Sequence, residues 1–247
     1  MSAPTLPAPS GPRPRGLCVT GTDTGVGKTA VLAAAAGCLR AQGVRVGVCK
    51  PVATGAVERD GRWVSADAVC LARAAGVEPW LARVTPWVFP DAVAPPVAAA
   101  RQGVTLTLAD LVAAVDWWET RAEFLLVEGV GGLLCPLTAR ATVADLAAAL
   151  GYPLVVVART ALGTLNHTLL TLEVAARRGL PVAGVILNEA DRPQGSLAEA
   201  TNPAELAERM QVPLLAVVRH RDDPDVIGRE ELAGVDWWRL TREARRE

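Results

Sequence analysis

The segment GTDTGVGKT at residues 21–29 constrains the fold of this 247-residue chain more than any other feature. It follows a short, mostly apolar run and precedes an Ala/Leu-rich stretch, an order typical of a strand, a tight loop and a helix. Glycines let successive backbone N–H groups turn toward one point, and the positive end of the following helix attracts an anion. The segment therefore predicts a phosphate-binding loop after the first strand of an α/β fold.

The loop differs at one position from the common phosphate-loop pattern, G-x-x-x-x-G-K-[ST]. Thr22 occupies the place of the first glycine, and Gly21 lies one residue earlier. The GKT ending is intact, so we expect Lys28 to reach the outer phosphates and Thr29 to bind Mg²⁺. The residues expected to surround the nucleotide phosphates are Thr24, Gly25, Val26, Gly27, Lys28 and Thr29.

Short Val/Leu/Ile-rich runs alternate with longer Ala/Leu-rich stretches along the rest of the chain. This alternation predicts an α/β fold with a doubly wound, mainly parallel sheet of the P-loop NTPase type. The predicted strands are residues 16–20, 44–49, 124–128, 154–158, 182–187 and 214–218. The predicted helices are residues 28–41, 66–75, 107–120, 142–150, 164–178 and 203–210.

The length and the first residues set the expected domain organisation. Residues 1–15 hold five prolines and no continuous apolar segment, so we expect a disordered Pro-rich tail and not a signal peptide. Residues 16–247 are expected to form a single domain, because about half the chain is apolar and can supply one core.

Charge and cysteine content exclude several classes of protein. The formal net charge is -1 with acidic and basic residues interleaved, which argues against binding to nucleic acid or to an anionic membrane. No apolar run approaches the roughly 18 residues of a membrane-spanning helix. The five cysteines include no CxxC pair and predict neither a disulfide framework nor a zinc site, so we expect a cytoplasmic protein.

Two further strands end in charged residues. Because the carboxyl ends of parallel strands meet at one edge of the sheet, Lys50 in KPVATG and Glu128 in FLLVE are expected near the phosphate loop. Lys50 can hold the γ-phosphate and Glu128 can bind Mg²⁺. On pattern alone, Lys50 can also be a solvated charge and Glu128 a turn-capping acid, while Asp67 is either a helix-start residue or a metal ligand.

The segment LGTLNHT at residues 162–168 leads into a predicted helix. The N–H groups at a helix start have no partners within the helix, and the helix dipole favours a negative charge there. We therefore expect this segment to suit a small anion such as a carboxylate.

Taken together, GTDTGVGKT, KPVATG, VEGVGG, LGTLNHT and the Asn188 that ends VILN resemble the dethiobiotin synthase family. The order and spacing of these motifs match that family from residue 16 to about residue 190. The resemblance implies the closure of the ureido ring of dethiobiotin from 7,8-diaminopelargonate, CO₂ and ATP. It implies a carbamate and a carbamic-phosphoric anhydride as intermediates, and a homodimer.

The resemblance also implies a role for each matching residue. Lys28, Lys50 and Thr24 take catalytic positions, and Thr29, Asp67 and Glu128 serve Mg²⁺. Asn188 reads the adenine. The residues implied to bind the substrate are Lys50, Thr54, Gly131 and, from the other subunit, Gly163, Thr164, Leu165 and Asn166.

Two segments differ from the family, and two rival functions remain open. Residues 94–98 read APPVA where the family often has Ser-Pro-His, and Arg219-His220 replaces a proline-containing turn near the base. A partitioning-type ATPase would share the loop and the sheet, but typically has a lysine where Thr22 lies. A corrinoid amide-forming synthase would need a glutaminase cysteine, and no cysteine follows residue 187.

Overall fold

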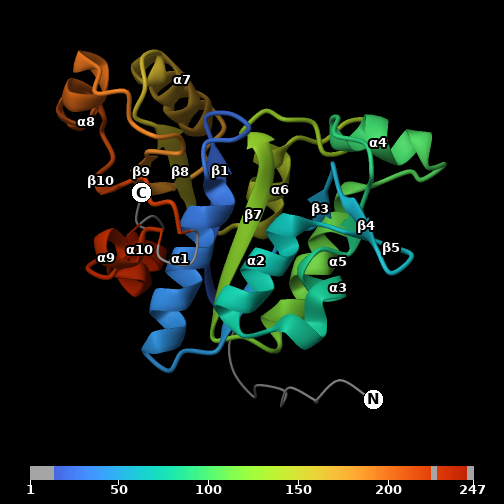
Figure 1. The fold of residues 1–247 in the computed structure, drawn as a ribbon. Helices are drawn as coiled ribbons and strands as arrows, with labels where there is room; N and C mark the ends of the chain where they lie inside the picture. The colour runs from blue at the N-terminus through green and yellow to red at the C-terminus, as the bar shows by residue number, and fades with distance from the viewer. Residues whose placement is uncertain (1–13, 224–226, 244–247) are drawn as a thin grey trace.

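A six-stranded parallel sheet forms the centre of the computed structural model, which describes residues 14–223 and 227–243 (Figure 1). The strand order across the sheet is β10-β9-β8-β1-β7-β2. These strands are β1 (Arg15–Gly21), β2 (Val46–Cys49), β7 (Phe124–Gly132), β8 (Leu154–Arg159), β9 (Val182–Asn188) and β10 (Leu214–Val218). All six predicted strands are confirmed, as is the doubly wound parallel sheet.

The central strands are apolar along their length because helices cover both faces of the sheet (Figure 1). The strand residues Leu17, Leu125 and Val156 are completely buried. In Figure 1, α1 (Lys28–Ala41) lies in front of the sheet and α6 (Val143–Leu150) behind it. The other long helices are α2 (Ala66–Ala75), α5 (Leu108–Glu119), α7 (Thr164–Arg177) and α8 (Leu197–Arg209).

Five of the six predicted helices agree with the structure to within about one residue, and α8 does not. The sequence predicts this helix over 203–210, from helical apolar spacing and strong helix formers. In the structure, α8 begins at Leu197, after a capping box in which Ser196 and Glu199 exchange hydrogen bonds. Pro203 lies inside the helix, so the capping signal outweighs the proline.

Short elements between residues 52 and 101 lie outside the sequence-based prediction, because two to seven residues carry too little periodicity. They are β3 (Val52–Ala53), β4 (Val57–Arg59), β5 (Arg62–Val64), the 3-10 helix η1 (Glu78–Trp80), α3 (Leu81–Val84), β6 (Trp87–Val88) and α4 (Pro95–Arg101). Two short helices, α9 (Arg229–Leu232) and α10 (Trp237–Glu243), follow β10 and were likewise not predicted. Asp60 and Gly61 form the tight turn of the β4–β5 hairpin, both with positive φ.

The predicted tail, residues 1–15, falls mostly outside the described residues. Its last residue, Arg15, already pairs with Phe124 as the first residue of β1. The strand therefore begins one residue earlier than predicted. Across the described residues, every helix is too short or too polar to cross a membrane.

The register of the central strands brings distant motifs together. β1 lies between β7 and β8, and Val19 of β1 is opposite Glu128 of β7. The pairing then shifts, so that Gly21 lies opposite Gly132. On the other side, Gly21 is opposite Val157 of β8, whose carbonyl accepts from the N–H of Thr22 at 3.0 Å. The loop after β1 is consequently held between the ends of two neighbouring strands.

Candidate active site

The predicted phosphate loop is a tight turn that leads directly into α1. Gly25 and Gly27 both have positive φ, at 73° and 90°, which glycine adopts without steric cost. Gly27 caps α1, and Lys28 is the first residue of the helix. The loop borders a cavity of about 500 Å³. Residues at or near the ends of β2, β7 and β9 also line this cavity. This geometry matches a site for a chain of phosphates.

Lys28 lies under the loop, only 6% exposed, and its Nζ donates to the carbonyl oxygen of Asp23 at 2.9 Å. Burial lowers the pKa of Lys28, and the nearby Glu128 carboxylate partly opposes this effect. The hydrogen-bond acceptor of the ammonium group is thus a neutral carbonyl and not a carboxylate. A phosphate oxygen would be a stronger acceptor than that carbonyl.

Lys50 lies between two carboxylates at the same sheet edge. Its Nζ donates to Asp67 Oδ2 and to Glu128 Oε1, the latter at 2.7 Å. The same Glu128 oxygen accepts from Thr29 Oγ1 at 2.8 Å. Burial lowers the pKa of Lys50, but the two carboxylates outweigh it and the pKa lies above its ordinary value. The structure thus brings Lys50, Asp67, Glu128 and the phosphate loop into one cluster.

The residues in this cluster fit a Mg²⁺ ion bound together with phosphates. Glu128 is 1% exposed, and its Oε2 has no hydrogen-bond partner among the described residues. A buried carboxylate oxygen without a partner is costly unless a cation satisfies it. The described residues include no group of three metal-binding His, Cys, Asp or Glu side chains, but Mg²⁺ at nucleotide sites typically uses one or two carboxylates, a hydroxyl and phosphate oxygens.

Thr54, Val130 and Gly131 line the cavity on the side of Lys50. Gly131 has a φ of 63°, and a Cβ added to it would lie 3.0 Å from Cys135 Sγ and 3.4 Å from Thr24 Oγ1. A side chain at this position would therefore crowd Cys135 and reach van der Waals contact with Thr24 of the phosphate loop. Glycine at this position avoids that crowding.

The opposite end of the cavity is formed by the ends of β9 and β10. Asn188, Glu189 and His220 line it, and the side chain of Asn188 points at the loop. Its Nδ2 donates to the carbonyl oxygen of Val26 at 3.0 Å, so the structure places this residue beside the loop. The cavity thus has a Lys50 end and an Asn188 end, with the phosphate loop between them.

The segment 163–166 does not reach this cavity within one chain. Gly163 caps α7 with a φ of 95°, and the Thr164 side chain is buried beside Thr168. The remaining residues of the segment are exposed or half-buried, and the neighbouring Leu162 is 88% exposed. None of residues 163–166 lines the cavity.

Arg159 contacts the loop and was missed by the sequence analysis. It ends β8, and its Nη2 donates to the carbonyl oxygen of Thr24 at 3.1 Å. The same atom lies 3.3 Å from the position of a Cβ at Gly25. In the sequence, an arginine at the end of an apolar strand cannot be told apart from an ordinary solvent-exposed charge. Only the pairing of β8 with β1 shows that Arg159 lies beside the loop.

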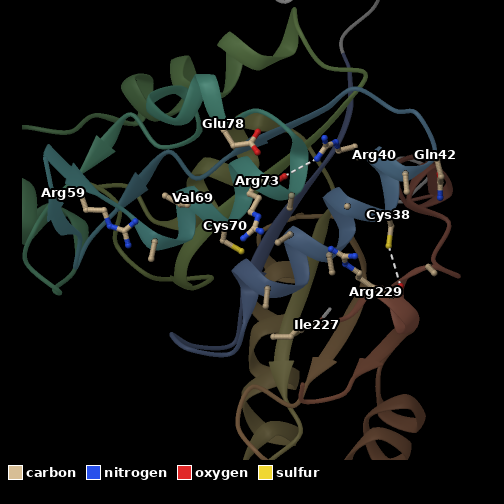
Figure 2. Close-up of a pocket in the computed structure, with 18 residues that line it drawn as sticks. Cys38, Arg40, Gln42, Arg59, Val69, Cys70, Arg73, Glu78, Ile227 and Arg229 are labelled. Atoms are coloured by element: carbon tan, nitrogen blue, oxygen red, sulfur yellow. Dashed lines mark hydrogen bonds between the residues drawn. The ribbon is translucent and has the colours of Figure 1, made fainter. Parts of the chain in front are cut away.

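A second, larger cavity of about 1200 Å³ lies between α1 and α2 (Figure 2). Alanines line much of it, with Arg40, Arg59, Arg73 and Arg229 also present. Arg40 donates to the carbonyl oxygen of Arg73. This cavity has neither the glycine-rich loop nor the Lys50 cluster, so the smaller cavity is the better candidate for phosphate chemistry despite its size.

Comparisons with known proteins identify the family of this chain. A family model described as an AAA domain matches residues 15–225. The ATP-dependent dethiobiotin synthetase BioD of Anaeromyxobacter dehalogenans (strain 2CP-C) is 45% identical over 89% of this chain and 96% of the relative. The BioD of Aromatoleum aromaticum is 41% identical over 84% of this chain and 91% of the relative.

Solved structures support the fold alone. The septum site-determining protein MinD of Pyrococcus horikoshii, in complex with Mg-ADP, has a TM-score of 0.51 at 21% identity, over 85% of this chain and 82% of that chain. The cell division ATPase MinD of Pyrococcus furiosus gives the same score and identity, over 85% of this chain and 84% of that chain. The close sequence relatives, however, share most of their length with this protein. The chain therefore belongs to the ATP-dependent dethiobiotin synthetase family.

Proposed function

We propose that this protein is a dethiobiotin synthetase of biotin biosynthesis, which closes a cyclic urea on 7,8-diaminopelargonate with CO₂ and ATP. The observation that carries the proposal is the Lys50 cluster. Lys50 is held by Asp67 and Glu128, and Glu128 also contacts Thr29 of the phosphate loop. A cation and acids at the outer end of a phosphate site suit the transfer of a phosphoryl group to a second substrate in the same cavity.

In the first step, one neutral amine of the substrate adds to CO₂ and loses a proton, which gives a carbamate. The new carboxylate carries a negative charge that needs a cation and hydrogen-bond donors. Lys50, Thr54 and Thr24 are assigned this role, because all three line the same cavity. The addition is accelerated when the amine and CO₂ are held together in the geometry of the reaction.

In the second step, a carbamate oxygen attacks the γ-phosphorus, and the bond to the bridging oxygen of ADP breaks. The product is a carbamic-phosphoric anhydride. Negative charge gathers on the transferred group, between Lys28 under the loop and Lys50 across the cavity. In the third step, the second amine attacks the carbonyl carbon, phosphate leaves, and loss of a proton completes the ring. No protein nucleophile is needed.

Mg²⁺ would be held by Thr29, Asp67 and Glu128, whose oxygens lie in the Lys50 cluster. When bound, Mg²⁺ neutralises charge on the β- and γ-phosphates. Gly25, Val26 and Gly27 would hold the phosphates with their backbone N–H groups, and Asn188 would contact the adenine. The position of Gly25, Gly27, Thr29, Asp67, Glu128 and Asn188 in the lining of the cavity supports these roles.

We further propose a homodimer in which Gly163, Thr164, Leu165 and Asn166 of a second copy receive the substrate carboxylate. In one chain this helix start lies outside the cavity, which supports a contribution across an interface. Exposed leucines next to it, Leu162 and Leu170, give the surrounding surface an apolar character suited to a partner.

The direct test is to incubate the purified chain with 7,8-diaminopelargonate, ¹³C-bicarbonate, Mg²⁺ and ATP. We expect labelled dethiobiotin by mass spectrometry, with ADP and phosphate formed in equal amounts. Omitting the diamine should suppress ADP formation. ATP hydrolysis that is indifferent to the diamine, without a labelled product, would refute the proposal and favour a nucleotide switch.

A further inference from the structure

A short turn joins the end of β8 to the start of α7. Thr160 and Ala161 follow β8, and the helix begins at Thr164. The N–H of Thr164 donates to the carbonyl oxygen of Ala161 at 3.2 Å, and the N–H of His167 donates to Gly163 immediately afterwards. The position of this turn therefore fixes the position of the first residues of α7.

Asn202 of α8 holds the turn from the neighbouring helix. α8 packs beside α7 (Figure 1), and Asn202 is only 4% exposed. Its Nδ2 donates to the carbonyl oxygen of Thr160 at 2.7 Å and to that of Ala161 at 3.2 Å. An amide NH₂ group has two N–H groups and can serve both carbonyls. One side chain thus binds two consecutive carbonyls of the turn, and the second of them also accepts from Thr164.

The helix start that this turn carries still has N–H groups to offer. Leu165 and Asn166 follow Thr164, and no backbone acceptor for their N–H groups lies within the described part of the chain. Such groups are suited to a carboxylate. Because the turn and the first helical bond adjoin, a shift of the turn would move both groups together.

We propose that Asn202 is a positioning residue for the substrate, and that it fixes the helix start 163–166 in the place where a second copy of the chain uses it. This inference rests on the proposed function and its shared site. Asn202 does not line the cavity of its own chain, so its effect belongs to the partner's site. Without the amide, the buried carbonyl of Thr160 loses its donor, and binding of the substrate must also order the segment.

The kinetic test is Asn202→Ala. We expect KM for 7,8-diaminopelargonate to rise about tenfold, with kcat and KM for ATP nearly unchanged, because the phosphate loop and Lys50 are not altered. Thr201→Ala is the matched control, since Thr201 is an exposed neighbour whose hydroxyl donates to Leu197 within α8. It should leave all three constants as they are in the unmodified chain. Asn202→Ala with an unchanged KM for the diamine, or with an equal rise in both KM values, would overturn the inference.

Mixed dimers separate positioning of the partner's site from general damage to the subunit. With Lys28→Ala subunits in about tenfold excess, nearly every Asn202→Ala subunit is paired with one of them after subunit exchange. The working site of that dimer combines the loop of the Asn202→Ala subunit with residues 163–166 of the Lys28→Ala subunit. KM for the diamine should therefore return to the value of the unmodified chain. A KM that stays raised would show that Asn202 acts on its own cavity, and the inference would be wrong.

Hydrogen exchange gives a readout that does not depend on activity. Asn202→Ala should speed exchange of the amides in residues 160–166 and leave those in residues 21–29 unchanged. Unchanged exchange in 160–166 would overturn the inference even if the unmodified chain formed no dethiobiotin, whereas that missing product would count against the proposed function alone. If the alanine variant does not fold, Asn202→Ser keeps one donor, and the same changes are expected at smaller size.

Discussion

Lys28 and Lys50 share a cavity, but their surroundings differ. Lys28 donates to a backbone carbonyl, and burial lowers its pKa. Burial acts in the same direction on Lys50, yet Glu128 and Asp67 raise its pKa above the ordinary value, so it is a permanent cation near neutral pH. Lys28 is therefore suited to binding the nucleotide, and Lys50 to balancing charge that appears during transfer.

This difference predicts separate effects for two alanine variants. Lys28→Ala should abolish both nucleotide affinity and turnover. Lys50→Ala should lower kcat at least about 100-fold while ADP affinity changes only a few-fold, because its cation acts on the transferred charge. Steady-state kinetics and calorimetry measure the two effects. An equal loss of ADP affinity in both variants would contradict this division.

Lys50→Ala should also destabilise the fold. It leaves the buried Glu128 carboxylate without its cation, a change that typically costs about 3 to 5 kcal/mol. Adding Glu128→Gln to that variant removes the charge and should restore much of the lost free energy of unfolding. Urea denaturation of the single and double variants checks this. No recovery in the double variant would show that the pair is not coupled.

Arg159 should support the phosphate loop from outside the cavity. Arg159→Ala removes the hydrogen bond to Thr24, so we expect KM for ATP to rise about five- to tenfold, with KM for the diamine unchanged. Arg159→Lys should recover part of the loss. Arg178→Ala is the control, because Arg178 is an exposed arginine paired with Asp145, away from the loop. The idea fails if both alanine variants behave alike.

At the scale of elements, helix starts decide boundaries that periodicity leaves open. Ser196 and Glu199 set the start of α8 ahead of Pro203. At α5, Thr107 and Asp110 form a capping box in which the Asp110 N–H donates to Thr107 and the Asp110 carboxylate accepts from the Thr107 N–H and hydroxyl. These hydrogen bonds lower the pKa of Asp110. The cap matters because α5 carries the buried Trp118 into the core.

Asp110→Ala should lower the free energy of unfolding by about 1 kcal/mol at neutral pH. A carboxyl group with a lowered folded-state pKa contributes stability above its unfolded pKa and loses it as pH falls through the folded value. The cost of the substitution should therefore shrink as the pH is lowered below about 4. Urea denaturation across this range measures it, and a cost that stays constant with pH would contradict the explanation.

At the scale of the whole molecule, the start of α7 lies outside the cavity of its own chain. If a second copy supplies residues 163–166, two inactive variants should complement each other. Lys28→Ala damages the loop, and Asn166→Asp places a charge against the substrate carboxylate at a position where a helix tolerates Asp well. After subunit exchange, an equal mixture should recover about a quarter of the original activity, since half the dimers are mixed and each has one intact site.

A mixture of Lys28→Ala with Lys50→Ala is the matched control. Lys28 and Lys50 are both supplied to a site by the same subunit. Each of the two sites in a mixed dimer therefore has one defect, and activity should stay absent. Activity equal to that of the unmodified protein in a strictly monomeric sample would instead rule out the shared site.

The sequence alone determined the elements and most of the site. Six strands, five helices and the gathering of Lys28, Lys50 and Glu128 followed from local apolar patterns and from the rule that ligands bind at the carboxyl ends of parallel strands. Only the resemblance to the family added Asp67 to this group. These features could be predicted because each depends on a short segment, or on a topology shared by all doubly wound sheets.

The tertiary structure alone decided which distant groups touch. The contacts of Asn188 with Val26 and of Arg159 with Thr24 join residues more than 130 positions apart, and they depend on strand order and register. The same packing leaves residues 163–166 outside the cavity of their own chain. Local patterns contain no information on such pairings, because they arise only when β1 is enclosed between β7 and β8 in the folded core.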